Sequence, residues 1–203
     1  MTKIKLCGLT RPCDIEAANQ LKPEYVGFVF APKSRRYVTP QKAAELKALL
    51  HPATKAVGVF VNEAPETVAA LLAAGTIDIA QLHGDEDDAY IKALRKQTDR
   101  PIIQAIRIDT AQDMIAAQNS RADFVLLDSG KGGTGKVFDW KLIQPIERPY
   151  FLAGGLGIDN VRPAIETLRP YAVDVSSGIE TDGWKDKIKM AEFVAAVRKE
   201  EKR

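Results

Sequence analysis

The feature that most constrains the fold is a recurrence of short apolar runs along the whole chain. Eight runs rich in Val, Ile and Phe occur over residues 3–8, 25–30, 55–61, 77–82, 101–108, 122–128, 149–154 and 172–177. Near-continuous apolar runs of this length are typical of strands that are covered on both faces, as in a parallel sheet. The sequence therefore predicts eight parallel strands.

Segments with helical spacing lie between these runs. Residues 39–50 begin with Thr39 as a cap and Pro40 in the first turn, and residues 64–75 end on Gly75, a common helix stop. The same pattern predicts helices over residues 88–97, 110–118, 158–168 and 187–199. Alternation of strand and helix at roughly 25 residues per unit predicts a parallel α/β fold.

Eight such units favour a TIM barrel, a closed parallel (β/α)8 sheet with outer helices. A doubly wound open sheet is the alternative, and it would leave two edge strands to protect. No low-complexity linker or break in composition divides the chain, so we expect a single domain over residues 1–203. In a barrel enzyme, reactive side chains are expected in the loops that follow the carboxyl ends of the strands.

Composition and charge argue against several classes of protein. The chain has 203 residues and a net charge of +2, which gives no electrostatic case for a nucleic-acid partner. No apolar stretch approaches the roughly 18–20 residues needed to cross a bilayer, and the first ten residues lack the apolar core of a signal peptide. The two cysteines, Cys7 and Cys13, do not have the spacing of a zinc site. We therefore expect a cytoplasmic protein without a metal centre.

A glycine-rich stretch, GKGGTGK over residues 130–136, fits the opening of a Walker A phosphate loop. The last place of that pattern needs a Ser or Thr hydroxyl for magnesium, whereas this sequence has Val137. Pro145 then stops the following helical segment after barely two turns, although a Walker loop normally opens a longer helix. We therefore reject a nucleotide site here and expect residues 131–136 to form a loop that closes over a site.

Two strand ends carry side chains suited to acid–base chemistry. Asp128 ends the run FVLLD, where partial desolvation can raise the pKa of a carboxyl group and make it a general acid. Its alternative role is to cap a turn or to pair with Lys131. Cys7 ends the first strand close to Arg11, where a nearby cation would favour the thiolate. A buried apolar role is the alternative for Cys7, and it is the role we expect for Cys13 in the first helix.

Other strand ends carry groups that bind anions. The stretch PKSRRY follows the second strand, and one of its cations pointing inward would grip a carboxylate or phosphate; they are Lys33, Arg35 and Arg36. The stretches LAGGLG and VSSGIE follow the seventh and eighth strands and leave backbone N–H groups free for an anion. Barrel enzymes often bind phosphate with these two loops. We therefore predict a phosphate site that both loops share.

The two histidines are separate features. His83, in QLHGDE after the fourth strand, is a candidate base, ligand or structural hydrogen-bonding group. His51 precedes Pro52 in a loop expected on the opposite face, so the histidines do not assemble a metal cluster. Residues 85–88 are interpreted as the acidic start of the next helix, where negative charge is favourable.

These motifs resemble those of the phosphoribosylanthranilate isomerase family, (β/α)8-barrel enzymes of tryptophan biosynthesis. The resemblance is carried, in order from residue 4 to about residue 180, by KLCGLT, GFVFAPKSRRYV, VGVFVNE, QLHGDE, LLDS, GGTGKVFDW, LAGGL and AVDVSSGIE. Two departures, Leu9 where Ile is commoner and the segment after Glu180, affect no residue expected to react.

The resemblance implies an aldose–ketose isomerase that needs no cofactor or metal. Its Amadori rearrangement would convert N-(5-phosphoribosyl)anthranilate to 1-(2-carboxyphenylamino)-1-deoxyribulose 5-phosphate. By the same resemblance, Asp128 is the general acid at the ring oxygen and Cys7 is the general base at C2. Arg36 would hold the anthranilate carboxylate and His83 would lie near the substrate. The residues grouped around the phosphate would be Gly154, Gly155, Asp174, Ser176, Ser177 and Gly178.

Three other functions stay open on the sequence. An indole-glycerol-phosphate synthase would favour a catalytic Lys and paired Glu at strand ends, which we do not find. A sugar isomerase of histidine biosynthesis would favour Asp in place of Cys7, and a non-catalytic barrel would bind a phosphate metabolite without turnover. We expect a small phosphosugar–anthranilate substrate as partner, no nucleic acid or membrane, and a monomer or homodimer.

Overall fold

The computed structural model of the protein describes residues 1–128 and 140–199. Within them, eight parallel strands form a closed barrel in sequence order, and the last strand pairs with the first. They are β1 (Lys3–Cys7), β2 (Tyr25–Val29), β3 (Lys55–Phe60), β4 (Ile79–Leu82), β5 (Ile102–Arg107), β6 (Phe124–Asp128), β7 (Tyr150–Leu152) and β8 (Ala172–Val175). Closure leaves no open edge in this sheet. The predicted closed barrel is confirmed, and the open-sheet alternative is wrong.

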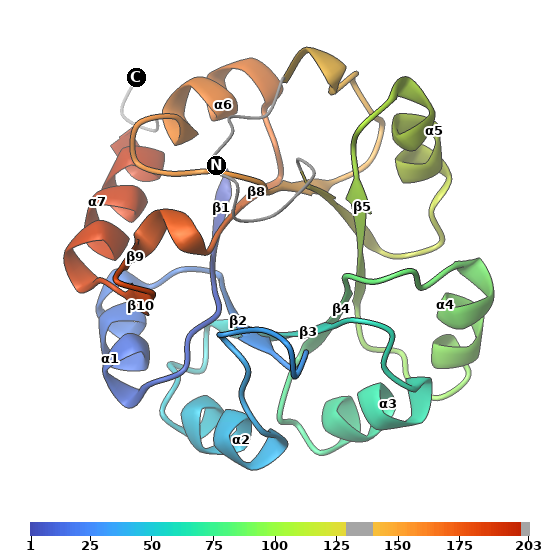
Figure 1. Cartoon of the computed structure of the whole chain (residues 1–203), viewed down its shortest axis with the longest axis horizontal. Helices are drawn as coiled ribbons and strands as arrows, with labels where there is room; N and C mark the ends of the chain where they lie inside the picture. Colours follow the sequence, from blue (N-terminus) through green and yellow to red (C-terminus); the bar gives the residue numbers. More distant parts are fainter. Residues whose placement is uncertain (129–139, 200–203) are drawn as a thin grey trace.

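The helices surround the ring of strands on the outside (Figure 1). They are α1 (Pro12–Leu21), α2 (Pro40–Ala48), α3 (Pro65–Ala73), α4 (Asp88–Arg95), α5 (Ala111–Asn119), α6 (Val161–Leu168) and α7 (Lys187–Arg198). The predicted cap of α2 is confirmed, because the Thr39 side chain accepts a hydrogen bond from Lys42 N over 3.1 Å. The expected packing of Cys13 is wrong: Cys13 is exposed in the first turn of α1, while Ile15 and Ala18 take the inner face.

Between β6 and β7 the described residues contain one short 3-10 helix, η1 (Trp140–Leu142), which lies shortly before Pro145. This agrees with the expectation that Pro145 limits the helical segment. The glycine-rich stretch at residues 130–136, and with it the predicted closing loop, lies outside the described residues.

The barrel interior changes from apolar to polar toward the carboxyl ends of the strands. Alternate residues of each strand point into the barrel. The part of the interior away from the carboxyl ends is filled by an apolar cluster that includes Tyr25, Ile103 and Phe151. Higher up, Lys5 and Asp174 are directly paired in the β1–β8 register and are both buried. The interior is therefore a packed core, and any substrate must bind at the mouth.

The chain after β8 forms an addition to the basic barrel. A 3-10 helix η2 (Ser177–Ile179) leads into a two-stranded antiparallel hairpin of β9 (Glu180–Thr181) and β10 (Trp184–Lys185). The hairpin lies beside the start of α1, because Arg11 donates to the Lys185 carbonyl over 2.7 Å and lies 5.0 Å from the centre of the Trp184 ring. The apolar and helical patterns of the sequence predicted no element here.

Candidate active site

The candidate functional residues follow consecutive strands around one rim of the barrel. All eight strands are parallel, so their carboxyl ends meet at the same rim. Going round the rim, β6 ends at Asp128, β7 and β8 lead into the two candidate phosphate loops, β1 ends at Cys7, and Arg36 follows β2. The expected acid and base are therefore separated by two strands, and both expected anion loops lie between them.

Cys7 is buried at the end of β1, where it packs with Val29 and Val59. Its register partner on β2 is Gly27, and a Cβ at Gly27 would lie only 2.6 Å from the Cys7 sulfur. A side chain at position 27 would therefore displace the thiol. The glycine of the run YVGFVF makes room for Cys7.

The charges around Cys7 oppose one another. Burial raises the pKa of the Cys7 thiol above its ordinary value, because a buried thiolate loses its hydration. The ammonium groups of Lys5 and Lys185 favour the thiolate, whereas the carboxylate of Asp174 disfavours it. The cation expected near Cys7 is thus present, but it is not Arg11, whose guanidinium is bound 2.7 Å from Asp14.

Lys5 and Asp174 form a buried ion pair below Cys7. Lys5 Nζ donates to Asp174 Oδ2 over 2.8 Å, and the Lys5 side chain is fully buried. Burial alone would lower the pKa of Lys5, but the charges of Asp174 and Cys7, with the hydrogen bonds to them, together outweigh it and raise the pKa. The resemblance to the family grouped Asp174 with the phosphate loops, but Asp174 lies within β8 and its carboxylate is paired with Lys5.

Asp128 is oriented by a chain of polar groups from β4. His83, which follows β4, has its Nε2 3.2 Å from Asp128 Oδ2. Its Nδ1 lies 2.8 Å from Gln81 Nε2. An Nδ1 that accepts from this amide leaves the Nε2 side of the ring to face Asp128. His83 thus contacts the expected acid, a role that the sequence analysis left open.

One of the three cations in PKSRRY points into the rim. Lys33 and Arg35 are exposed, whereas Arg36 is half-buried. The stem of Arg36 lies against Gly8, where a Cβ would come within 2.5 Å of Arg36 Cδ. Since Gly8 also has a φ of +81°, two constraints favour glycine next to Cys7.

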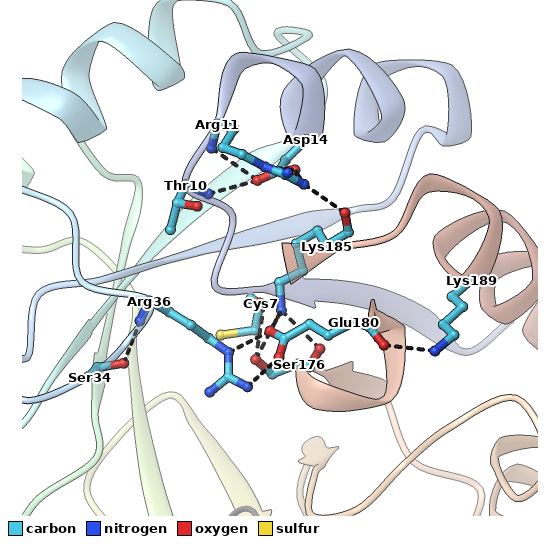
Figure 2. A network of polar contacts seen from close by, with 10 residues as sticks. All are labelled: Cys7, Thr10, Arg11, Asp14, Ser34, Arg36, Ser176, Glu180, Lys185 and Lys189. Atoms are coloured by element: carbon cyan, nitrogen blue, oxygen red, sulfur yellow. Dashed lines mark hydrogen bonds and ion pairs between the residues drawn. The ribbon is translucent and has the colours of Figure 1, made fainter. Parts of the chain in front are cut away.

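The guanidinium of Arg36 is held by Glu180, a residue to which the sequence analysis gave no role. Arg36 Nε and Nη2 donate to the two Glu180 oxygens over 2.6 and 2.8 Å, as Figure 2 shows. Lys185 Nζ also donates to Glu180, over 2.6 Å. Burial alone would raise the pKa of Glu180, but the hydrogen bonds from Arg36 and Lys185 outweigh it and lower the pKa.

The two loops after β7 and β8 present backbone N–H groups to the same part of the rim. Gly154 and Gly155 have φ of +87° and +65°, and Asn160 braces their loop by donating to the Gly155 carbonyl over 2.9 Å. A Cβ at Gly178 would collide with the backbone of Leu156, so the two loops lie in contact. Within residues 1–128 and 140–199, no hydrogen bond occupies the N–H groups of Gly154, Gly155, Ser177 and Gly178. Such groups are suited to an anion.

The remaining candidates at the rim have structural partners. Asp87 caps α4 by accepting from Tyr90 N over 2.9 Å, and buried Glu86 accepts from Asn62 N and Gly84 N. The acidic helix start predicted over residues 85–88 is confirmed for Asp87 and Asp88, whereas Glu86 precedes the helix and binds loop N–H groups. His51 is exposed in the loop between α2 and β3, at the opposite end of the barrel. In the described part of the chain, no three His, Cys, Asp or Glu side chains are grouped as metal ligands.

The chain matches the family model of N-(5'-phosphoribosyl)anthranilate isomerase over residues 4–196. This chain belongs to the phosphoribosylanthranilate isomerase family. The N-(5'-phosphoribosyl)anthranilate isomerase of Dechloromonas aromatica is 48% identical over 98% of this chain and 97% of its own length. That of Endomicrobium trichonymphae is 43% identical over 98% and 99%.

Solved members of the family share the fold over its full length. The phosphoribosyl anthranilate isomerase of Thermotoga maritima superposes with a TM-score of 0.90 at 38% identity, covering 98% of this chain and all of its own. A phosphoribosyl anthranilate isomerase in complex with reduced 1-(o-carboxyphenylamino)-1-deoxyribulose 5-phosphate superposes with a TM-score of 0.87 at 36% identity, with the same coverage. The family indicated by the sequence motifs is confirmed.

Proposed function

We propose that this chain is an aldose–ketose isomerase of tryptophan biosynthesis, which rearranges N-(5'-phosphoribosyl)anthranilate to 1-(2-carboxyphenylamino)-1-deoxyribulose 5-phosphate. The observation that carries the proposal is the placement of Cys7 and Asp128 on opposite sides of the two loops with glycine N–H groups, in a chain of this family. A related enzyme binds the reduced form of this product.

In the first step, Asp128 acts as the general acid. It transfers a proton to the ring oxygen of the ribose as the bond between C1 and that oxygen breaks, and the anilino nitrogen supplies the electron pair that forms the iminium. The Asp128 carboxylate left behind accepts the Nε2–H of His83, which lies 3.2 Å away. The hydrogen bond favours the ionised product of this step.

In the second step, Cys7 acts as the general base. Its thiolate removes the C2 proton, and the C–H electron pair forms the C1–C2 double bond as the iminium nitrogen regains its lone pair. The resulting enolamine takes a proton at C1 and loses the C2 hydroxyl proton, giving the ketone. Lys5 and Lys185 favour the thiolate, and the cationic iminium makes the C2 proton more acidic.

The two anionic groups of the substrate bind on either side of Cys7 in this proposal. The guanidinium of Arg36 takes the anthranilate carboxylate. The N–H groups of Gly154, Gly155, Ser177 and Gly178, with the Ser177 hydroxyl, take the phosphate. We leave the Ser176 hydroxyl out, because its one proton is donated to the Cys7 carbonyl over 3.1 Å. We leave Asp174 out of the phosphate site, because its carboxylate is an anion that is already paired with Lys5.

We further propose a single (β/α)8-barrel domain over residues 1–203 that acts in the cytoplasm as a monomer or homodimer. One related structure is of monomers generated from the dimeric enzyme of Thermotoga maritima. No helix in the described residues is long and apolar enough to cross a membrane. The phosphosugar–anthranilate substrate is the proposed partner, and no step above uses a cofactor or nucleic acid.

The test is turnover by the purified chain. Added to N-(5'-phosphoribosyl)anthranilate, it should cause a loss of anthranilate-type fluorescence at a rate proportional to protein concentration, and a chelator should leave that rate unchanged. Binding of the substrate without turnover would instead support the non-catalytic barrel. The same turnover assay is run with the aldose that the sugar isomerase of histidine biosynthesis acts on. A higher kcat/KM for that aldose than for N-(5'-phosphoribosyl)anthranilate would contradict the proposal.

A further inference from the structure

Glu180 joins parts of the rim that are far apart in the sequence. Its side chain is only 7% exposed and receives donors from Arg36, after β2, and from Lys185, on β10. Arg36 lies 144 positions before it in the chain. Burying a carboxylate with two cations costs desolvation energy, which is offset only if the carboxylate oxygens are well hydrogen-bonded. The geometry of this cluster is therefore closely constrained.

Lys185 has each of its three N–H donors directed at a nearby oxygen. Its ammonium lies 2.6 Å from Glu180 Oε1, 2.9 Å from the Ser176 carbonyl and 3.2 Å from the Ser176 hydroxyl. The Ser176 hydroxyl in turn donates to the Cys7 carbonyl over 3.1 Å. Figure 2 shows these contacts running from Glu180 through Lys185 to the backbone of Cys7.

Among the described residues, one edge of the Arg36 guanidinium is bound by Glu180 and the other has no hydrogen-bond partner. Glu180 takes the edge formed by Nε and Nη2 in a bidentate contact. A guanidinium has five N–H donors in a rigid plane, so three remain on Nη1 and Nη2, and two of these lie along the edge formed by the two atoms. A cavity of about 190 Å³ is lined by Arg36, Gly8 and Glu180 among other residues. Glu180 thereby fixes the direction in which the free edge faces.

We propose that Glu180 is a positioning residue that holds Arg36 and Lys185 together so that the free edge of Arg36 faces the carboxylate of the substrate. This inference rests on the proposed function, since that function supplies the carboxylate. Without the anion of Glu180, Arg36 and Lys185 would be two like charges on opposite sides of one gap, and Coulomb repulsion would move them apart.

The test compares ligands with and without the aromatic carboxylate. In Glu180→Gln, the amide keeps one acceptor but turns a donor toward Arg36 or Lys185. We expect affinity for reduced 1-(o-carboxyphenylamino)-1-deoxyribulose 5-phosphate to fall about tenfold or more, the order of one charge-assisted hydrogen bond. Affinity for ribulose 5-phosphate, which lacks the anthranilate group, should fall by a smaller factor, because the hydrogen bonds that Glu180 accepts come from Arg36 and Lys185 and not from the N–H groups proposed to bind the phosphate.

Two further variants separate positioning from folding. Glu180→Asp keeps the charge and should recover part of the lost affinity, and exposed Glu192→Gln on α7 is the matched control, with both affinities unchanged. Equal weakening of both ligands by Glu180→Gln, or weakening of neither, overturns the inference. Because these are binding measurements, they do not depend on turnover, which tests the proposed function separately.

Discussion

His83 Nε2 lies 3.2 Å from Asp128 Oδ2 although the two residues are 45 positions apart and belong to the ends of β4 and β6, which are separated by β5. The other ring nitrogen lies 2.8 Å from Gln81 Nε2, and this contact holds the ring orientation from inside the barrel. The contact assigns His83 to the acid side of the site. Its role in the proposed mechanism is to stabilise the Asp128 carboxylate after proton transfer.

His83→Ala should lower kcat about tenfold with little change in KM, since a hydrogen bond to a charged group contributes about 1.5 kcal/mol at the lower end of its range. The 3.2 Å separation is long for such a bond, which favours that lower end. Steady-state kinetics measures both constants. His51→Ala, at the opposite end of the barrel, is the control, and an unchanged kcat in His83→Ala would remove His83 from the mechanism.

The pKa of Cys7 predicts the pH dependence of the reaction. Burial raises the pKa of this thiol above its ordinary value, so the basic form grows as pH rises. Because kcat/KM reports ionisations of the free enzyme, it should rise with pH on a limb whose midpoint lies above the pKa of an ordinary cysteine.

Lys185→Met supplies the matched variant for this pH profile. It removes one of the two cations that favour the thiolate, so the rising limb should move to higher pH. The measurement is kcat/KM over a series of buffers at constant ionic strength. A limb that stays in place or moves to lower pH would show that Lys185 does not act on the group that titrates.

Asp174→Asn should destabilise the fold because it leaves the ammonium of Lys5 buried without its counter-ion. Removing one partner of a buried pair costs about 3–5 kcal/mol in free energy of unfolding. Denaturant unfolding at pH 7 measures it. Glu166→Gln, which breaks the exposed Arg162–Glu166 pair on α6, should cost less than about 1 kcal/mol; equal losses in both variants would contradict the account.

Gly27→Ala should lower kcat about tenfold to a hundredfold, because the added Cβ occupies space 2.6 Å from the Cys7 sulfur and misplaces the base. Gly75→Ala is the control for general strain: Gly75 has a φ of +71° but lies in the loop between α3 and β4, at the other end of the barrel. It should lose stability and keep kcat. If Gly27→Ala also keeps kcat, the fit between β1 and β2 has no role in placing the thiol.

The sequence predicted those parts of the site that depend on local pattern. Apolar runs located all eight strands, and in a parallel barrel a strand end is also a position on the rim, so Cys7 and Asp128 were found together. The glycines of the β7 loop were predictable because adjacent positive φ values exclude most side chains.

The ion pairs of the site were not predictable, because nothing local specifies a partner far along the chain. Lys5 could be noted as a charge two positions before Cys7 within an apolar run, but its partner Asp174 is 169 residues away. Glu180 and Lys185 face Arg36 and Cys7 only because the hairpin of β9 and β10 turns back toward β1. Cys13 was predicted to pack inward but is exposed, because in a helix a shift of one position in the first turn turns a side chain from the inner face to the solvent.

The central claim is that Cys7 and Asp128 divide the proton transfers between them. Its most direct test is kcat for N-(5'-phosphoribosyl)anthranilate in Cys7→Ala and in Asp128→Asn, with affinity for reduced 1-(o-carboxyphenylamino)-1-deoxyribulose 5-phosphate measured on the same preparations. The account predicts that each substitution lowers kcat at least about a hundredfold, the contribution typical of a general acid or base, while each variant stays folded and binds the reduced product. Near-normal turnover in both variants would contradict the claim.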